Sequence, residues 1–244
     1  MALIDKLTAI AEAIRSKTNT SEKLTLDEMP SVIEGIQSGG EDYARFAKTI
    51  TFQSLNIFGK EKVELNLDNI ISLSNLFQIT ISANKNTIVE HLTINASTKV
   101  QSVNQMLYSS GSSSDDNVLK RLTFNVDTSA CTAFSSFCSG RLGLEVIDGT
   151  PLNFSENTAT SINGFARCSK LIEFRVVENS IKVNLILSAC SKLSDETIKS
   201  IIGGLADLTG QTAQTITWHK DIEAKLSEEQ KAQITSKNWT IAFQ

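Results

Sequence analysis

The sequence contains few of the residues from which enzyme and metal sites are built. Its 244 residues include two histidines, His91 and His219, and four cysteines. No cysteine pair has the two-residue spacing of a zinc site, and no serine stands in the Gly-x-Ser-x-Gly setting of a hydrolase nucleophile. The two histidines flank different strand motifs, so we expect both on the surface and far apart. The sequence therefore predicts no catalytic, metal or cofactor site.

The sequence also lacks an excess of positive charge and any long apolar run. The formal net charge is −4, which argues against a nucleic-acid-binding surface. No segment approaches the roughly 18 uncharged apolar residues of a membrane-spanning helix. Asp5, Lys6, Glu12 and Arg15 interrupt the apolar core that a secretory signal requires. With two prolines, the chain has no rigid proline-rich linker. We expect neither a nucleic-acid partner nor membrane insertion.

The four cysteines allow two disulfides, but we expect free thiols. Cys138, Cys168 and Cys190 stand at similar places in turns, where cysteine serves as a small buried hydrophobic residue. The lack of a secretory signal agrees with synthesis in a reducing compartment, where disulfides are rare.

In place of chemical motifs, the sequence has a short strand motif that recurs along its middle. Each copy alternates apolar, polar and apolar residues, the two-residue period of a strand with one buried face. A spacing of roughly 20–30 residues fits a leucine-rich-repeat solenoid. One unit cannot bury its own apolar edge, so we expect the units to stack. The copies are Leu65-Asn66-Leu67, Leu92-Thr93-Ile94, Leu122-Thr123-Phe124, Leu144-Glu145-Val146 and Phe174-Arg175-Val176.

A second apolar pair follows most of these strands at three-residue spacing, which suits one helical turn. We expect these side chains to point back toward the strand and to close each unit. The pairs are Val103 with Met106, Phe134 with Phe137, and Ile162 with Phe165.

The turns after these pairs carry a recurring cysteine. Clear copies are Phe165-Ala166-Arg167-Cys168-Ser169-Lys170-Leu171 and Leu187-Ser188-Ala189-Cys190-Ser191-Lys192-Leu193. An apolar residue, two further residues and Cys-Ser-x-Leu resemble the turn of the BspA-type leucine-rich repeat. The resemblance covers about residues 62–193. It implies an α/β repeat fold, namely a leucine-rich-repeat (BspA-like) solenoid with a parallel sheet. Before residue 118 the turns lack the cysteine, and the assignment depends on periodicity alone.

Residues 1–38 are expected to form a helical hairpin with an apolar face. Asp27 can cap the second helix, and Ser38-Gly39-Gly40 ends it as a flexible joint. The hairpin is either a cap on the repeats or, as the glycines favour, an anchoring and oligomerisation element. Residues 39–61 are then a linker and entry strand. The candidate assembly face is Leu3, Leu7, Ile10, Ile14, Met29, Ile33 and Ile36.

The same hairpin carries a second resemblance. Its sequence has an apolar helix, then Ala13-Ile14-Arg15-Ser16-Lys17-Thr18-Asn19-Thr20, then Met29-Pro30 and Ile33-Glu34-Gly35-Ile36. This order resembles the N-terminal segment of tail and baseplate proteins from phages and prophages of Gram-positive bacteria. Asn19 stands where that family usually has glycine, and asparagine tolerates left-handed backbone angles. The resemblance implies attachment to a virion.

Residues 194–244 are expected to close the stack as a C-terminal helix–strand cap. Ser194 is a helix N-cap followed by Asp195 and Glu196, and the helix should run to about Leu208. Residues 227–230 form a capping box for a second helix to about Ser236. Residues 215–218 and 239–243 have the strand pattern.

The outward row of the predicted sheet is the candidate binding face. It is either a site for a glycan or protein or an ordinary solvated sheet, and its lack of aromatic residues favours the second. In the solvated case, Glu145 and Arg175 would form an exposed ion pair. Thr217 is a candidate for a further member. The face consists of Asn66, His91, Thr93, Asn95, Arg121, Thr123, Asn125, Glu145 and Arg175.

These features favour a non-enzymatic structural or interaction protein associated with a phage or prophage tail. It would be made in the bacterial cytoplasm and become part of the virion. Its partners would be other tail or baseplate proteins, or further copies of itself, with a host surface glycan or protein as ligand. The alternative is a bacterial cell-surface adhesin with BspA-type repeats, which requires an export signal. An intracellular enzyme is a third and weaker alternative.

Overall fold

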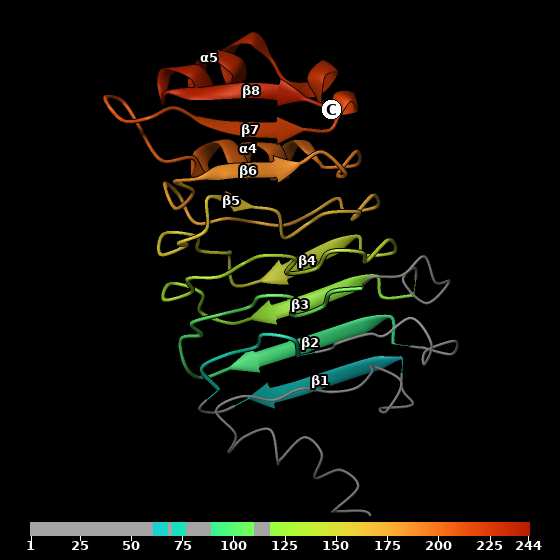
Figure 1. Ribbon diagram of the computed structural model, residues 1–244. Helices are drawn as coiled ribbons and strands as arrows, with labels where there is room; N and C mark the ends of the chain where they lie inside the picture. Colours follow the sequence, from blue (N-terminus) through green and yellow to red (C-terminus); the bar gives the residue numbers. More distant parts are fainter. Residues whose placement is uncertain (1–60, 68–69, 77–88, 110–117) are drawn as a thin grey trace, which may run out of the picture.

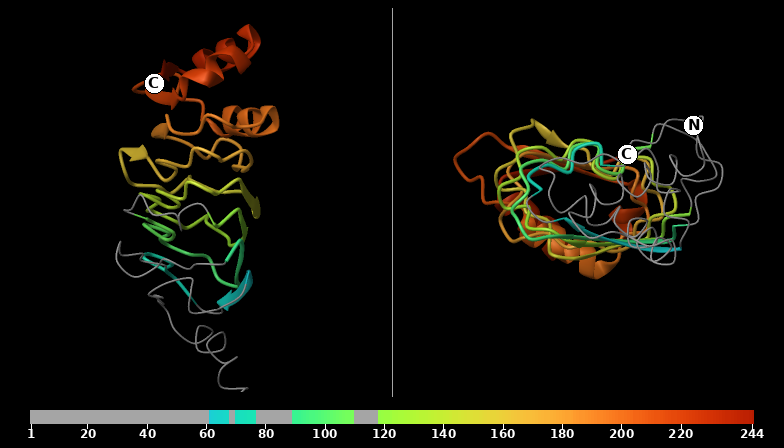
Figure 2. Two further views of the ribbon diagram at one scale, coloured as in Figure 1. Left: turned by 90° about the vertical axis from the view of Figure 1, so that its right-hand side faces the viewer. Right: turned by 90° about the horizontal axis from the view of Figure 1, so that it is seen from below.

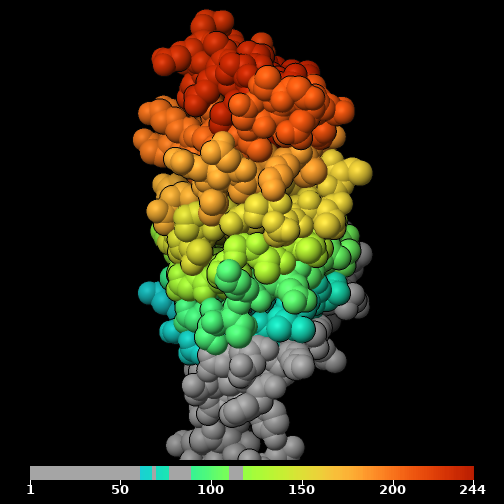
Figure 3. Space-filling model, turned by 90° about the vertical axis from the view of Figure 1, so that its left-hand side faces the viewer, coloured from blue at the N-terminus to red at the C-terminus, as the bar shows by residue number. Residues whose placement is uncertain are grey.

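The computed structural model describes residues 61–67, 70–76, 89–109 and 118–244. In this part of the chain, successive segments lie above one another in sequence order along one long axis (Figures 1 and 3). The strands form two parallel four-stranded sheets, with the orders β1-β2-β3-β4 and β5-β6-β7-β8. Parallel sheets with few helices are compatible with the predicted α/β repeat fold.

The first sheet contains β1 (Lys62–Leu67), β2 (His91–Ala96), β3 (Arg121–Asn125) and β4 (Val146–Gly149). Its strands pair in register, so that Leu92 lies between Val63 and Leu122. These three side chains are buried, whereas the alternate residues of each strand face outward. The apolar-polar alternation therefore gives the first sheet one core face and one outer face.

The second sheet contains β5 (Ser161–Ile162), β6 (Asn184–Leu187), β7 (Gln214–Trp218) and β8 (Trp239–Phe243). It lies on the side of the stack opposite β1–β4 (Figure 2). Its strands also run in the opposite direction to those of the first sheet (Figure 1). On this side of the lower levels, the described residues form single parallel bridges, from Ser72 to Ser102 and from Ser102 to Ala133. The sequence did not predict β6.

The helices belong to the upper part of the stack. They are α4 (Asp195–Gly204), α5 (Glu228–Ser236) and the 3₁₀ helix η3 (Lys220–Lys225). The predicted N-cap Ser194 accepts a hydrogen bond from Thr197 N, and α4 ends earlier than predicted. The predicted capping box of α5 is also confirmed. Within the described residues, no helix is long and apolar enough to cross a membrane.

One continuous apolar cluster fills the space between the two sides, from Val63 on β1 to Trp239 on β8. The apolar pairs predicted to point inward are all buried. In the middle levels the core contains a chain of phenylalanine rings. Phe137 lies 5.4 Å from Phe124 and 6.2 Å from Phe165, and Phe165 stacks on Phe174 at 4.7 Å, measured between ring centroids. Full burial of such a side chain contributes about 1.5–3 kcal/mol.

Two strand predictions were wrong in detail. The strand placed at residues 144–146 is β4, which begins at Val146 and ends at Gly149. Residues 174–176 are not a strand, although Phe174 and Val176 are buried as expected. Instead, single bridges join Glu173 to Val146 and Val176 to Leu152.

The reason for the second difference is the element above residues 174–176, which is helix α4. In place of strand carbonyls, two hydroxyls one helical turn apart accept the backbone N–H groups. Phe174 N donates to Thr197 Oγ1 at 3.3 Å, and Val176 N donates to Ser200 Oγ at 3.1 Å. Helix α4 thus takes the place of the next strand in the column of β1–β4 (Figure 2). Its side-chain hydroxyls accept the hydrogen bonds that the backbone carbonyls of a strand would accept.

The predicted hairpin of residues 1–38, with its assembly face, lies outside the described residues. The same holds for residues 39–60, most of the predicted linker. The helical hairpin and the linker therefore stay predictions.

Candidate binding face on the first sheet

The register of β1–β4 arranges the outward side chains in rows that run along the stack. One row contains Lys62, His91 and Arg121, and the next contains Glu64, Thr93, Thr123 and Asp148. A third row contains Asn66, Asn95 and Asn125. Parallel strands lie about 4.8 Å apart, so each row presents one polar group per strand at that spacing.

The three asparagines form an amide ladder. Asn125 Nδ2 donates to Asn95 Oδ1, and Asn95 Nδ2 donates to both Asn66 Oδ1 and Glu64 Oε1, each at 2.8 Å. The amides therefore point the same way along the stack. Because each group is held by its neighbour, the face loses little conformational freedom when it binds a ligand.

The other two rows are linked by a hydrogen bond and an ion pair. His91 Nε2 lies 2.9 Å from Thr123 Oγ1, and the Arg121 guanidinium pairs with the Asp148 carboxylate. Burial, and then the nearby charge of Arg121, lower the pKa of His91 below its usual 6.5. His91 is thus a neutral polar group of the face at neutral pH.

Most predicted members of the face are confirmed as outward residues of β1–β3, with one change of row. Asn66 was expected beside Thr93, but the register places Glu64 beside Thr93 and Asn66 beside Asn95. The predicted strand motif lies two residues further along the chain than the residues that pair with Leu92-Thr93-Ile94. The two choices could not be distinguished, because Val63-Glu64-Leu65 and Leu65-Asn66-Leu67 have the same alternation.

Glu145 was wrongly placed on the face. It precedes β4, and Asp148 occupies the position opposite Thr123. Two adjacent apolar residues, Val146 and Ile147, shift the phase of the alternation, and local pattern alone does not distinguish the two phases. The expected ion pair of Glu145 with Arg175 is not present. Arg175 Nη2 donates to Gly149 O at 2.9 Å, and Arg121 is the partner of Asp148.

Thr217 does not join this face. It lies on β7 of the second sheet, on the opposite side of the stack (Figures 1 and 2). His219 follows β7, and its Nδ1 accepts a hydrogen bond from Asp221 N at 3.1 Å. The two histidines therefore belong to opposite sides of the stack, in agreement with the expectation that they lie far apart.

A hollow of about 330 Å³ lies directly above the face, where β4, residues 173–175 and α4 meet. Ile147 and Phe174 form its apolar floor, and both are buried. Its rim carries the charged side chains of Asp148, Glu173, Arg175 and Glu196. The sequence did not indicate the hollow, because it forms only where a helix replaces the next strand.

The four cysteines are buried free thiols, as predicted. Burial raises the pKa of Cys131 to about 11 and that of Cys168 to about 12, and it raises those of Cys138 and Cys190 as well. Their predicted equivalence is only partial. Cys138 N donates to Gly164 O, which places Cys138 level with Phe165 and not with Cys168. Neutral, covered thiols are poor nucleophiles and poor metal ligands.

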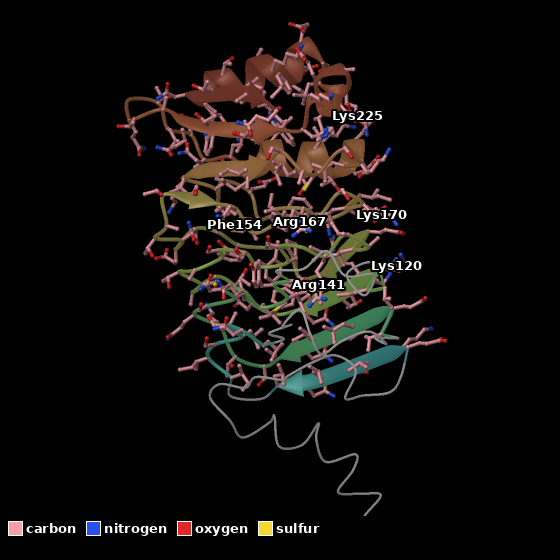
Figure 4. The ribbon with its side chains drawn as sticks, turned by 45° about the vertical axis from the view of Figure 1, so that its right-hand side comes forward. Lys120, Arg141, Phe154, Arg167, Lys170 and Lys225 are labelled. Atoms are coloured by element: carbon pink, nitrogen blue, oxygen red, sulfur yellow. The ribbon has the colours of Figure 1, made fainter. Side chains whose placement is uncertain are left out.

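Several cations lie at the edge where the strands of the first sheet begin. Figure 4 shows Lys120, Lys170 and Lys225 at successive levels along this edge. The backbone of Lys120, however, is bonded to Glu90 on one side and to Glu145 on the other. At this level, therefore, acidic residues flank Lys120 along the edge.

Within the described part of the chain, no group of three or more His, Cys, Asp or Glu side chains is placed to hold a metal ion. The outer face of β1–β4 and the adjoining hollow together form a continuous polar surface that a ligand could contact. Comparison with family models, with curated proteins and with solved structures gives no match to this chain.

Proposed function

We propose that the chain is a non-enzymatic structural and interaction protein, built as a leucine-rich-repeat solenoid of the BspA-like type. It is associated with a phage or prophage tail and presents the outer face of β1–β4 to a protein or to the host surface. The solenoid assignment is supported by in-register parallel strands on one side and a second column of short parallel pairings on the other. Each unit buries its apolar edge against the next.

The observation that carries the binding proposal is the ordered polar surface of the first sheet. Its side chains are fixed by mutual contacts, such as the amide ladder and the Arg121–Asp148 pair. A pre-organised polar surface suits recognition, because little entropy is lost on binding. The opposite placement of His91 and His219 and the high pKa of the cysteines favour binding over catalysis.

Tail association is supported by the resemblance of residues 1–36 to tail and baseplate proteins. In this proposal the hairpin of residues 1–38 anchors the protein, and the repeats project toward the host. Genes for tail and lysis proteins beside the gene for this chain would be expected.

The anchoring role is tested by comparing the full chain with a chain that lacks residues 1–38. We expect circular dichroism to report a folded solenoid in both and multi-angle light scattering to report a smaller assembly for the shortened chain. An equal number of subunits in the two proteins would contradict anchoring.

The binding face is tested by sedimentation of the labelled full chain with intact Gram-positive cells. Thr123→Lys places a cation in the middle of the face, and Thr240→Lys makes the same change on β8, on the opposite side. We expect only Thr123→Lys to reduce the bound fraction, by about tenfold for a buried contact region. Equal binding of the two variants would show that this face is not the site.

A further inference from the structure

The hollow above the binding face has the size of a small ligand site. Its volume of about 330 Å³ is at the lower end of the range for such sites, about 300–1,000 Å³. It shares Asp148 with the row of Glu64, Thr93 and Thr123, so it is continuous with the face. A ligand that lies along the rows would reach the hollow at the upper end of the sheet.

The rim of the hollow carries charges of both signs. Asp148 is paired with Arg121 on the side of the sheet, and the bridge from Val146 to Glu173 brings Arg175 next to Asp148. Glu173 lies two residues before Arg175, and Glu196 projects from the first turn of α4. Three carboxylates and the Arg175 guanidinium thus line one small space, and the Arg121 guanidinium pairs with Asp148 beside it.

These groups are held in position by the layers above and below. Glu173 and Arg175 flank the buried Phe174, whose N–H is bonded to Thr197 of α4. One N–H of the Arg175 guanidinium is bonded to Gly149 O at 2.9 Å. The side chains therefore point outward from a fixed backbone, which is how a recognition site keeps its geometry without a ligand.

This arrangement selects the chemistry of the ligand. An anion would meet three carboxylates, and a simple cation would meet the Arg175 guanidinium. A hydroxyl group both donates and accepts hydrogen bonds, so it can donate to a carboxylate and accept from a guanidinium. Adjacent hydroxyls on a neutral ring match neighbouring charges of opposite sign.

We propose that the hollow binds one neutral sugar residue of a host-surface glycan, whose hydroxyls donate hydrogen bonds to Glu173 and Glu196 and accept one from Arg175. This inference depends on the proposed binding function and names its ligand. Because Phe174 is buried, the ring gains no aromatic stacking, and one site binds weakly. Firm attachment then requires several copies of the chain on one particle.

The test uses the full chain and saturation-transfer difference NMR with glucose, galactose and N-acetylglucosamine as neutral probes. Glucosamine is the cationic probe, and glucuronate is the anionic probe. We expect a signal from at least one neutral sugar and a weaker one from both charged probes. Glu173→Gln and Arg175→Met should each weaken binding of the neutral sugar by about tenfold. Glu178→Gln and Lys182→Met change exposed residues outside the hollow and should leave it unchanged.

The inference is overturned if no neutral sugar binds, if a charged probe binds best, or if the hollow variants bind like the controls. Circular dichroism on each variant separates lost binding from lost folding. Cell sedimentation that still depends on Thr123, without any sugar signal, would leave the proposed function standing and refute the sugar site alone.

Discussion

Glycine at position 140 is required by both its backbone angle and its surroundings. Gly140 has φ +85°, and a Cβ there would lie 2.1 Å from Ser109 O. Gly140 N donates to Ala166 O, which places Arg167 of the next unit level with Gly140. Arg167 has φ +63°. Both turns therefore place a residue with left-handed backbone angles at this position. Of the two residues, only Gly140 lies so close to the neighbouring backbone that a Cβ would collide with it.

We expect Gly140→Ala to destabilise the protein much more than Gly210→Ala. Gly210 has φ +80° and nothing within 4 Å of a Cβ, so alanine there meets only the backbone penalty of about 1 kcal/mol. At Gly140 the collision with Ser109 adds about 1–3 kcal/mol. Urea denaturation measures both free energies of unfolding. Equal losses would mean that the turn relaxes to admit the methyl group.

A second prediction at this scale concerns the titration of His91. Burial and then Arg121 lower its pKa, while Asp148 raises it and Lys62 lowers it least. Arg121→Gln should therefore raise the pKa of His91, and Lys62→Gln should raise it by less. NMR titration of the imidazole resonances measures all three values. A pKa of 6.5 or above in the unmodified protein, or a larger shift from Lys62→Gln, would contradict this account.

The same shift has a consequence for stability. The unfolded chain binds the His91 proton more tightly than the folded chain does. The contribution of His91 is therefore fully present above pH 6.5 and is lost as the pH falls through 6.5 toward the folded pKa. The effect is small because His91 is partly exposed.

At the scale of elements, the change from strand to helix in the column of β1–β4 depends on Thr197. Its hydroxyl accepts from Phe174 N and donates to Ile172 O at 3.0 Å, and its side chain is buried. Together, the hydroxyls of Thr197 and Ser200 accept hydrogen bonds from backbone N–H groups that would otherwise face α4 without an acceptor. This junction also creates the hollow.

We expect Thr197→Val to cost about 1–3 kcal/mol, because valine keeps the shape but leaves a buried N–H without an acceptor. Thr235→Val on α5 is the control, since its hydroxyl bonds only exposed helix carbonyls. That change should stay within about 0.5 kcal/mol. Thermal and urea unfolding of the two variants measure the difference. A loss at Thr197 no larger than at Thr235 would show that water or another group replaces the hydroxyl.

At the scale of the whole molecule, the two sheets share one apolar cluster, which predicts cooperative unfolding. Trp218 and Trp239 report on the upper levels of the stack, and Cys131, which follows β3, reports on the lower levels. We expect tryptophan fluorescence and pulsed alkylation of Cys131, followed by mass spectrometry, to give one urea midpoint. Alkylation at lower urea than the fluorescence change would divide the stack into two independent units.

Much of the architecture was predictable from local pattern. The alternation in residues 92–94 and 122–124 placed two strands correctly, and the cap signals at Ser194 and Ser227 placed both helices. Such signals act over a few residues, so the sequence contains them in full. The burial of Cys138, Cys168 and Cys190 was predicted from their recurrence in turns, whereas that of Cys131 was not.

The sequence by itself determined most of the residues that face inward, because alternation and capping are properties of neighbouring residues. At β4, where Val146 and Ile147 are adjacent, it left two phases of the alternation open. Only the tertiary structure decided which outward residues become neighbours. Asp148 replaced Glu145, and Glu64 rather than Asn66 joined Thr93, because register is set by how whole levels stack. The hollow beside Arg175 likewise depends on α4, a segment about twenty residues further along the chain.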